Sequence, residues 1–554
     1  MPYPHPHAEL PTHTVTNQPP PLSDYNLFDS DRALVEAVTR EGAPESVARA
    51  RAFGAELGRA EVLALGETAN RHPPELKAFD RYGHRLDEVE FHPAYHDLMA
   101  LSIGHRQSAV AWIGEAGGHV SHTALEFLMH EVEAGVCCPM SMTYAGIPAL
   151  RHNPELAAAW EPKLISESYD PVLRPMVEKS GCTMGMAMTE KQGGSDVRSN
   201  TTQAAPCPGE GEEIYTLTGH KWFCSAPMSD AFLTLAYAEG GLTCFFAPRF
   251  TPEGARNRIF VQRLKDKLGN KANASAEIEY HGAWARRVGA EGAGVRTILE
   301  MVHHTRLDTT LGAASLMRRA LAEAIHHCEH RTAFQKKLID QPAMQTLLAD
   351  LAVESEAATA LAFRIARAFD ESAGSETARG FARLAVALGK YWLNKRVVGV
   401  VFEALEAHGG VGYVEEAPLA RIYREAPLNS IWEGSGNVIA LDILRAISRN
   451  PESLAAVRAE MAAARGADRR LDAALDGLAD MLNGPVAESQ ARLLAERMAV
   501  CLQGALLVRH APVAVADAFC ATRLDAGAGR AFGAIAGRID SAAILHRASP
   551  GRAA

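Results

Sequence analysis

The feature that most constrains this chain is the order of its hydrophobic patterns. Residues 31–180 place apolar side chains at three- and four-residue steps, as in 31–38, where Ser30 is a candidate N-cap. The texture then becomes β-like, and helical spacing returns from residue 291. The clearest strand patterns lie at 214–219, 231–237, 242–247 and 275–280, and the long helical stretches at 294–332, 342–370 and 377–407. This order predicts an α+β multidomain fold with a small β domain between helical regions.

These changes of pattern divide the chain into five parts. We expect an N-terminal arm at 1–30, an α-helical domain at 31–181, a middle β domain at 182–290, a C-terminal α-helical bundle at 291–450 and an additional helical domain at 451–554. We call residues 451–554 the extension.

Composition excludes several classes of protein. The 554 residues include 47% hydrophobic and 22% charged residues, which is neither a disordered nor a fibrous composition. With 66 acids and 56 bases the net charge is −10, so the whole molecule is not a general binder of polyanions. Nine cysteines without a CxxC spacing favour reduced thiols, and we expect no metal site.

The same composition bears on location. No uncharged apolar run reaches the roughly 18 residues that span a bilayer, and residues 1–22 lack the basic and apolar regions of a signal peptide. We therefore expect a cytoplasmic protein with no membrane partner.

The extension differs in charge from the rest of the chain. It contains no lysine, since Lys395 is the last, and its 12 arginines and 11 acids give a net charge of +1, against −11 for residues 1–450. Arginines suit phosphate recognition, although arginines on helices are often solvated or paired within the chain.

Four segments have residues that suit ligand binding or catalysis. Gly193 and Gly194 permit close backbone approach, Arg331 suits a pyrophosphate, and Glu433 suits a general base if a pocket raises its pKa. Taken singly, each segment also has a purely structural explanation. In chain order these are a turn, a pair of core aromatic residues, an arginine that compensates a helix C-terminus and a surface glutamate. The segments are 188–196, 220–225, 331–334 with Gln341, and 409–437 with its two glycine-rich turns.

Together, their order and spacing resemble the acyl-CoA dehydrogenase family over about residues 31–450. The shared motifs are MTE…GGSD, G-x-K-W-F, R-x-x-F, GG-x-G-Y and Y-R…I-x-E-G-S-x-N. The chain is similar above all to the AidB branch of that family, flavoproteins of the response to DNA alkylation, through residues 12–22, 37–42, 188–196, 263–270, 429–437 and the extension. The resemblance implies an N-terminal α domain, a middle β domain, a C-terminal four-helix bundle and an extra C-terminal helical domain.

The resemblance also implies FAD as cofactor and a homotetramer built as a dimer of dimers. The residues matched to the flavin site of the same subunit are Met186, Met188, Thr189, Gly194, Ser195, Trp222, Phe223, Ser225, Ile431, Trp432, Gly434, Ser435 and Asn437. Those matched to residues that reach the cofactor of a neighbouring subunit are Arg331, Phe334 and Gln341.

For the family reaction, α,β-dehydrogenation of an acyl-CoA, the resemblance implies Glu433 as base and Arg306 near the substrate. Some members take their base from an earlier helix, but residues 305–308 supply no glutamate there. Glu406 and Trp432 depart from common family residues, so we expect weak acyl-CoA dehydrogenase activity.

AidB resemblance further implies that the extension binds double-stranded DNA. The arginines expected to contact it are Arg445, Arg523, Arg530, Arg538 and Arg547. Two alternatives stay open: a metabolic acyl-CoA dehydrogenase with a C-terminal assembly domain, and a non-catalytic FAD scaffold.

Overall fold

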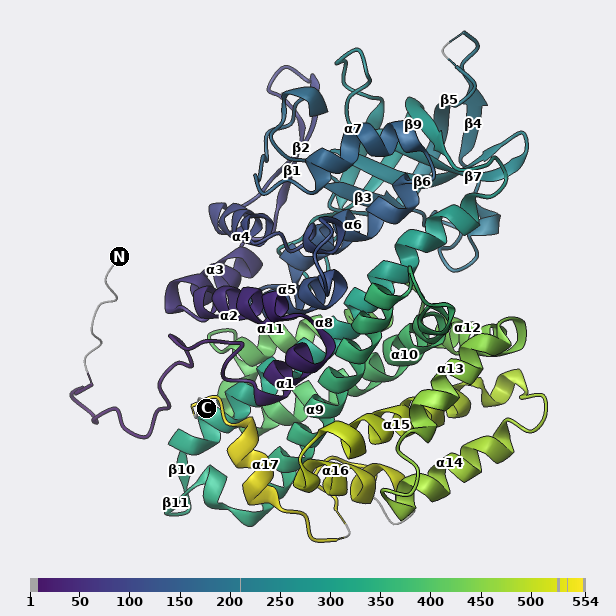
Figure 1. The fold of residues 1–554 in the computed structure, drawn as a ribbon. Helices are drawn as coiled ribbons and strands as arrows, with labels where there is room; N and C mark the ends of the chain where they lie inside the picture. Colours follow the sequence, from purple (N-terminus) through teal and green to yellow (C-terminus); the bar gives the residue numbers. More distant parts are fainter. Residues whose placement is uncertain (1–7, 210, 526–528, 536, 552–554) are drawn as a thin grey trace.

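The computed structural model describes residues 8–209, 211–525, 529–535 and 537–551. Figure 1 shows the β-rich part at one end, the N-terminal helices beside it and the long central helices below, with the extension at the opposite end. The predicted α+β fold is confirmed. Within the described residues no helix is both long and apolar enough to cross a membrane.

The N-terminal part is helical with one interruption. Its helices are α1 (Arg32–Glu41), α2 (Pro44–Leu57), α3 (Ala60–Arg71), α4 (Pro93–Gly104), α5 (Gly118–Val132), α6 (Ala134–Leu150) and α7 (Pro154–Leu164). Between α3 and α4 lies a hairpin of β1 (Glu75–Phe79) and β2 (Arg85–Glu90), which the helical pattern did not predict. The expected N-cap Ser30 is wrong, because Asp31 accepts the hydrogen bond from the Leu34 amide of α1.

The middle part is a β structure that closes on itself. Its strands are β3 (Met184–Ala187), β4 (Gln203–Pro206), β5 (Ile214–Ser225), β6 (Ala231–Ala238), β7 (Gly241–Pro248), β8 (Ile259–Leu264) and β9 (Ser275–Val288). The pairings β6–β4, β4–β5, β5–β9, β9–β7 and β7–β6 form a closed ring, and β3 and β8 attach to β6 and β9. The predicted strands are confirmed, although the first and last extend well past their expected ends.

Three long helices form the centre of the molecule. They are α8 (Gly294–His330), α9 (Pro342–Glu371) and α10 (Glu376–Ala407), followed by α11 (Pro418–Glu425) and α12 (Gly436–Arg449). α8 packs against both α9 and α10, and it also contacts α5 and α6 of the N-terminal part. A small hairpin, β10 (Thr332–Ala333) with β11 (Lys336–Lys337), joins α8 to α9.

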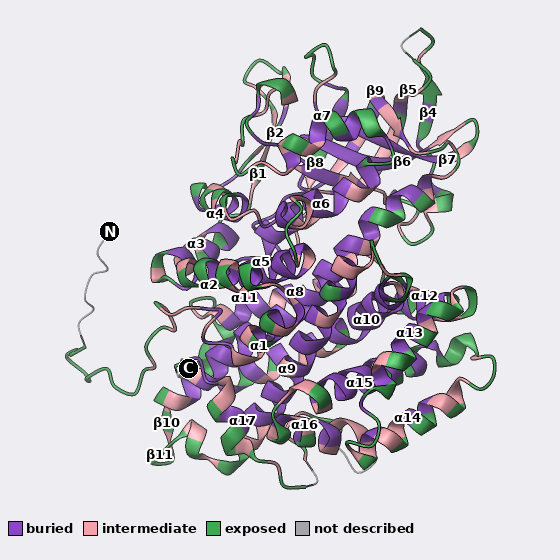
Figure 2. Cartoon of the chain, viewed as in Figure 1, coloured by how far each residue is buried: buried purple, intermediate pink, exposed green. Residues whose placement is uncertain are grey.

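The extension is helical, as expected, and shares the core of the central helices. It contains α13 (Pro451–Ala462), α14 (Arg469–Met481), α15 (Ala491–His510), α16 (Val513–Phe519) and α17 (Ser541–Ala548). α15 packs against α9, α10 and α12, and its Leu494, Met498 and Leu502 are fully buried in the same cluster as Leu361 of α9. Figure 2 shows this buried face directed at the bundle.

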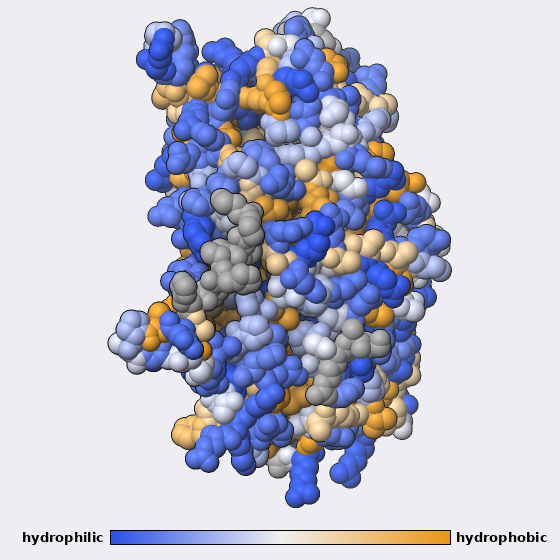
Figure 3. Space-filling model, turned by 90° about the vertical axis from the view of Figure 1, so that its left-hand side faces the viewer, coloured by the Kyte–Doolittle hydropathy of each residue, from blue (hydrophilic) through white to orange (hydrophobic). Residues whose placement is uncertain are grey.

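The outer surface carries no single large apolar area in the view of Figure 3. That face is mostly hydrophilic, and its apolar residues are scattered over it.

Candidate active site

The loop at 429–435, just before α12, carries the predicted base. Glu433 has a left-handed backbone with φ 57°, and Gly434 follows with φ 108°. A methyl group at Gly434 would lie 2.8 Å from the Ile439 side chain. This position therefore requires glycine for two reasons, the positive φ and the lack of space for a side chain. Left-handed backbone at a non-glycine residue is uncommon and tends to occur at functional sites.

Lys390 of α10 fixes this loop through hydrogen bonds to two of its backbone carbonyls. Its Nζ donates to the Asn429 carbonyl at 2.7 Å and to the Trp432 carbonyl at 2.8 Å. The Trp432 indole in turn donates to Asn429 Oδ1 at 2.8 Å. Burial lowers the pKa of Lys390 to about 7, despite the opposing charge of Glu433. The loop is therefore fixed by a buried amine whose pKa lies far below the ordinary lysine value.

The Glu433 carboxylate is desolvated and only partly partnered. Its Oε2 atom is buried and has no hydrogen-bond partner. Burial raises the pKa of Glu433, while the Thr305 hydroxyl and the charge of Arg306 oppose that rise. A carboxylate with a raised pKa and a free oxygen is suited to taking a proton from a carbon acid near neutral pH.

Arg306 of α8 binds the backbone of the same residue. Its Nε donates to the Glu433 carbonyl at 3.2 Å, and its Nη1 lies 2.9 Å from Asp442 Oδ2. Arg383 pairs with the other oxygen of Asp442 at 2.9 Å. The guanidinium therefore positions the 429–435 loop, and its expected contact with substrate stays a prediction.

The predicted flavin loop lies where β3 ends and contributes hydroxyl groups. Thr189 is half-buried, Ser195 is exposed, and the Trp222 amide donates to the Thr189 carbonyl at 2.8 Å. A methyl group on Gly194 would lie 2.5 Å from Thr189 Oγ1, so the glycine lets the loop fold onto the threonine. Glu190 anchors the loop through a buried ion pair of 2.8 Å with Lys221.

The apolar residues of both loops meet on one cluster. Met186, Met188 and Trp432 are all partly buried against the core that includes Met142, Met184 and Met301. Phe223 and Ile431 are exposed beside them. Lys265 covers Trp222, with Nζ 3.2 Å from the ring centroid. Lys191 Nζ and Arg263 Cζ lie 5.6 and 5.8 Å from the same centroid, so three cations surround this indole.

Three further residues at this place were missed from the sequence. The thiol of Cys138 on α6 lies near Ser225 and Asn273, and burial raises its pKa to about 12. The Glu433 charge acts on this thiol in the same direction, and the Lys267 charge acts against it. Cys138 and Lys390 lie in segments without a recognisable motif, whereas Lys267 belongs to the segment 263–270 that carries the family resemblance. Only the fold brings the three residues to the predicted site.

Arg331, Phe334 and Gln341 lie at the other end of α8. Arg331 follows the end of α8 and lies 25 residues beyond Arg306, which is about 37 Å along the helix axis. Phe334 is 93% exposed with φ 51°, Arg331 donates to the Asn17 carbonyl at 2.5 Å, and Gln341 donates to the Ala333 carbonyl at 3.1 Å. None of the three can reach the Glu433 site of its own chain.

Two of the arginines expected at DNA are engaged within the chain, which corrects that expectation. Arg523 pairs with Asp350 and Glu354 of α9, both at 2.8 Å, and its side chain is only 11% exposed. Arg547 is equally enclosed, between Glu356 at 2.9 Å and Glu36. Their paired and buried guanidinium groups are not available to a phosphate backbone.

The other three arginines stay exposed. Arg445 makes only a loose contact of 3.6 Å with Asp442, and Arg530 and Arg538 lie on the surface.

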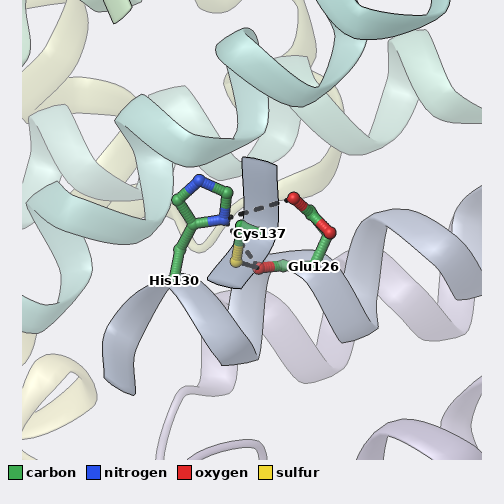
Figure 4. A group of neighbouring side chains, drawn as sticks. All are labelled: Glu126, His130 and Cys137. Atoms are coloured by element: carbon green, nitrogen blue, oxygen red, sulfur yellow. Dashed lines mark hydrogen bonds and ion pairs between the residues drawn. The ribbon is translucent and has the colours of Figure 1, made fainter. Parts of the chain in front are cut away.

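One group of buried side chains has the composition of a metal site. Glu126, His130 and Cys137 lie together between α5 and α6 (Figure 4). However, His130 Nδ1 is 2.9 Å from the Glu126 carbonyl, a hydrogen bond within α5, and burial raises the pKa of Glu126 to about 8. His130 Nδ1 is thus already engaged in the hydrogen bond within α5, and burial disfavours the charged carboxylate that a metal ion would need, so we assign the cluster to the core.

A three-part fold with a desolvated glutamate between a hydroxyl-bearing loop and the bundle defines an oxidoreductase of the acyl-CoA dehydrogenase type, which depends on FAD. Residues 17–171 match the family described as adaptive response protein AidB N-terminal domain. Residues 185–283 and 292–448 match the middle and C-terminal domains of acyl-CoA dehydrogenase. The chain belongs to the acyl-CoA dehydrogenase family, in its AidB branch.

Individual proteins agree with this assignment. The chain is 45% identical to the putative acyl-CoA dehydrogenase AidB of Escherichia coli, over 94% of this chain and 95% of that one. It is 32% identical to acyl-CoA dehydrogenase family member 11 of Caenorhabditis elegans, over 76% and 70% of the two chains. The solved structure of Caenorhabditis elegans ACDH-11 in complex with C11-CoA is similar with a TM-score of 0.83 and 26% identity, covering 99% of this chain and 94% of that one.

The residues present fit FAD. Thr189 and Ser195 offer hydroxyl donors to a polar cofactor edge, the glycine at 194 keeps the loop close to Thr189, and Met186, Met188 and Trp432 offer apolar surface. The Oε2 atom of Glu433 is buried without a hydrogen-bond partner, and the role of this residue as the base stays a prediction.

Proposed function

We propose that this protein is an AidB-type FAD flavoprotein that binds double-stranded DNA, takes part in the response to DNA alkylation and retains weak acyl-CoA dehydrogenase activity. The observation that carries the catalytic part is the buried, unpartnered Oε2 of Glu433 on a carboxyl group of raised pKa. The match of residues 17–171 to the adaptive response protein AidB family supports a role in that response, and the DNA part rests on the exposed arginines Arg445, Arg530 and Arg538.

In the dehydrogenation, Glu433 accepts the α-proton of the acyl thioester on Oε2. Arg306 and Lys390 hold the backbone on either side of it, through the carbonyls of Glu433 and Trp432. FAD, when bound, supplies the acceptor for the hydride from the β-carbon. The loop carbonyls are therefore fixed before the substrate arrives, and no reorganisation is needed at the proton transfer.

The cofactor would be held by residues from both loops and from a second subunit. Met186, Met188, Thr189, Gly194, Ser195, Trp222, Phe223, Ser225, Ile431, Trp432, Gly434, Ser435 and Asn437 would bind it within one chain. Arg331, Phe334 and Gln341 would reach the cofactor of a neighbour in a homotetramer, and the exposed Phe334 ring supports this contact.

Weak turnover is expected because two residues of the substrate region differ from common family residues. Trp432 is fixed next to the base by its bond to Asn429, where a large indole narrows the approach of an acyl chain. Glu406 is exposed on α10 and places a negative charge where an anionic CoA would pass. The structural relative with bound C11-CoA supports acyl-CoA as the ligand class.

DNA would be bound in the cytoplasm through the exposed arginines Arg445, Arg530 and Arg538. Salt dependence tests this proposal, because each phosphate contact releases counterions. Duplex DNA titrated at two salt concentrations should bind several-fold more weakly at the higher one, and a triple Ala variant of these arginines should reduce that dependence. Absence of binding at low salt would refute the DNA part.

The runner-up is a metabolic acyl-CoA dehydrogenase whose extension serves assembly. The continuous core between the extension and the bundle favours it. Anaerobic mixing of the flavin-loaded protein with a panel of acyl-CoAs separates the two functions. Fast and complete flavin bleaching by one chain length would favour the metabolic enzyme, whereas slow or partial bleaching by all of them agrees with our proposal.

A further inference from the structure

A buried ion pair lies between three helices beside the candidate base. Oδ1 of Asp308 on α8 is 3.0 Å from Nε2 of His122 on α5, and the two side chains are 3% and 0% exposed. The Ser141 hydroxyl of α6 donates to the other oxygen of Asp308. A buried ion pair adds little stability compared with well-packed apolar side chains. Stability alone is therefore a poor explanation for this pair.

The hydrogen bonds of His122 determine its protonation. Its Nδ1 lies 2.6 Å from the Gln107 carbonyl oxygen, which can only accept, so this nitrogen carries a hydrogen. A second hydrogen lies between Nε2 and Asp308, and on Nε2 it makes the ring a cation. Although burial opposes it, the Asp308 charge raises the pKa of His122. The pair is thus a carboxylate next to an imidazolium in the interior of the protein.

Two helices place Asp308 about one turn away from Glu433. On α8, the Thr305 hydroxyl lies at the Glu433 carboxyl group, and Asp308 is three residues further along the same face. On α6, Cys138 lies near Glu433, and Ser141 at Asp308 is likewise three residues further on. Burial raises the pKa of Glu433, and the charge of Asp308 adds to that rise.

The other titratable groups around the pair and the base have been pushed toward neutrality or act in the opposite sense. Arg306 of α8 and Lys390 of α10 lower the pKa of Glu433. The His122 ring stacks on Tyr144 of α6, with 3.6 Å between the ring centroids. Burial disfavours the charged form of each neighbour of the pair, which are His119, Glu126, His130, Cys137, Tyr144 and His304. Among these neighbours, the charges that remain are those of the pair itself.

We infer that Asp308 and His122 are a positioning pair for the base: the carboxylate makes Glu433 bind a proton more readily, and the imidazolium limits that effect. A second carboxylate close to a first favours its protonated form, and a cation acts in the opposite direction. The inference rests on the proposed role of Glu433 in the dehydrogenation. It gives a role to two residues that lie outside the motifs shared with the family.

The test compares pH profiles of the flavin-loaded, full-length protein. The flavin absorbance is titrated with pH without substrate, and the rate of bleaching by an acyl-CoA is measured over the same range. Asp308→Asn should move both midpoints to lower pH by about one unit, because the carboxylate that favours the protonated base is lost. His122→Gln should move both midpoints to higher pH, because the carboxylate loses its cation. A merely structural role would not give opposite shifts.

Asp230→Asn is the matched control, because it removes the carboxylate of another buried ion pair, with Lys179 at 2.6 Å and just before β6. It should leave both midpoints in place. Midpoints equal to those of the control in both variants would overturn the inference, and so would shifts in the same direction. If Asp308→Asn yields no folded protein, the direction of the His122→Gln shift decides.

Failure of the proposed function has a different result. A midpoint that persists in Glu433→Gln belongs to a group other than the proposed base. A midpoint that disappears in Glu433→Gln but is the same in Asp308→Asn as in the parent protein keeps the base and overturns the inference.

Discussion

At the scale of single residues, the environment of Glu433 decides what the site can do. The same glutamate on the surface would have an ordinary pKa and would be ionised but weakly basic. Burial, an unpartnered oxygen and a strained backbone make it a candidate base.

Replacing Glu433 with Gln should abolish flavin bleaching by acyl-CoA while FAD stays bound. General-base catalysis contributes typically about 10²–10⁴-fold, so a loss of about 100-fold or more is expected in the bleaching rate. Stopped-flow absorbance measures it, and Glu416→Gln, an exposed glutamate outside the loop, is the control. Unchanged bleaching in the Glu433 variant would exclude it as the base.

The pH dependence of bleaching should follow the same carboxyl group. Proton removal needs the ionised form, and burial raises the pKa of Glu433, so the rate should increase with pH above the ordinary glutamate range. The charge of Lys390 lowers that pKa. Lys390→Met should therefore move the rise in rate to higher pH, while Lys336→Met, in the distant β10–β11 hairpin, should leave it in place. A profile that is identical in the Lys390 variant would contradict this coupling.

At the scale of elements, ion pairs join the extension to the helices of the bundle. Arg523 inserts between two acids of α9, and the nearby Arg396 binds Glu354 as well, at 3.0 Å. Although burial opposes it, these two arginines hold the pKa of Glu354 near 2. From the sequence, Asp350 and Glu354 were recognisable only as residues of a predicted helix.

Arg523→Met should destabilise the protein, because Asp350 and Glu354 would be left buried with one cation fewer. Breaking a buried ion pair by removing one partner costs roughly 3–5 kcal/mol. Arg530→Met, at an exposed position, should change the free energy of unfolding by no more than about 0.5 kcal/mol. Urea unfolding followed by circular dichroism compares them, and equal stabilities would mean that the ion pairs contribute little.

At the scale of the whole molecule, the extension and the bundle share one core. Trp392 of α10 donates to Gln503 of α15 at 3.0 Å, a buried hydrogen bond across the boundary. Figure 1 places α15 directly against the long helices. The described extension therefore packs as one body with the bundle. A variant that removes the extension to abolish DNA binding should also disturb the bundle that binds the cofactor.

A chain that ends at residue 450 should fold poorly. Removing α15 exposes apolar surface of α9 and α10, and each large apolar side chain that loses its cover costs about 1.5–3 kcal/mol. We expect low soluble yield and a lowered thermal midpoint relative to the full chain. If the shortened protein is soluble, retains FAD and melts at the same temperature, the extension is an independent domain.

The sequence allowed much of the fold to be predicted, because strand and helix periodicities are local. The long helices and the strands predicted at 231–237 and 242–247 appeared where expected. The β1–β2 hairpin was missed because five- and six-residue strands between two proline-containing breaks carry little pattern. The expectation for Arg523 and Arg547 was wrong for a different reason: the number of charges is a property of the sequence, but their pairing depends on the neighbours that the fold supplies.

The sequence by itself determined the family, through motifs whose order survives in the chain, and with it the candidate base and cofactor loop. Only the tertiary structure decided which side chains act there. Lys390, Cys138 and Arg306 come to Glu433 from three different helices, and Arg492 comes to Asn437 from a fourth. Burial and charge pairing depend on distances in space. The desolvated carboxyl group of Glu433 and the ion-paired guanidinium of Arg523 therefore appear only in the folded chain.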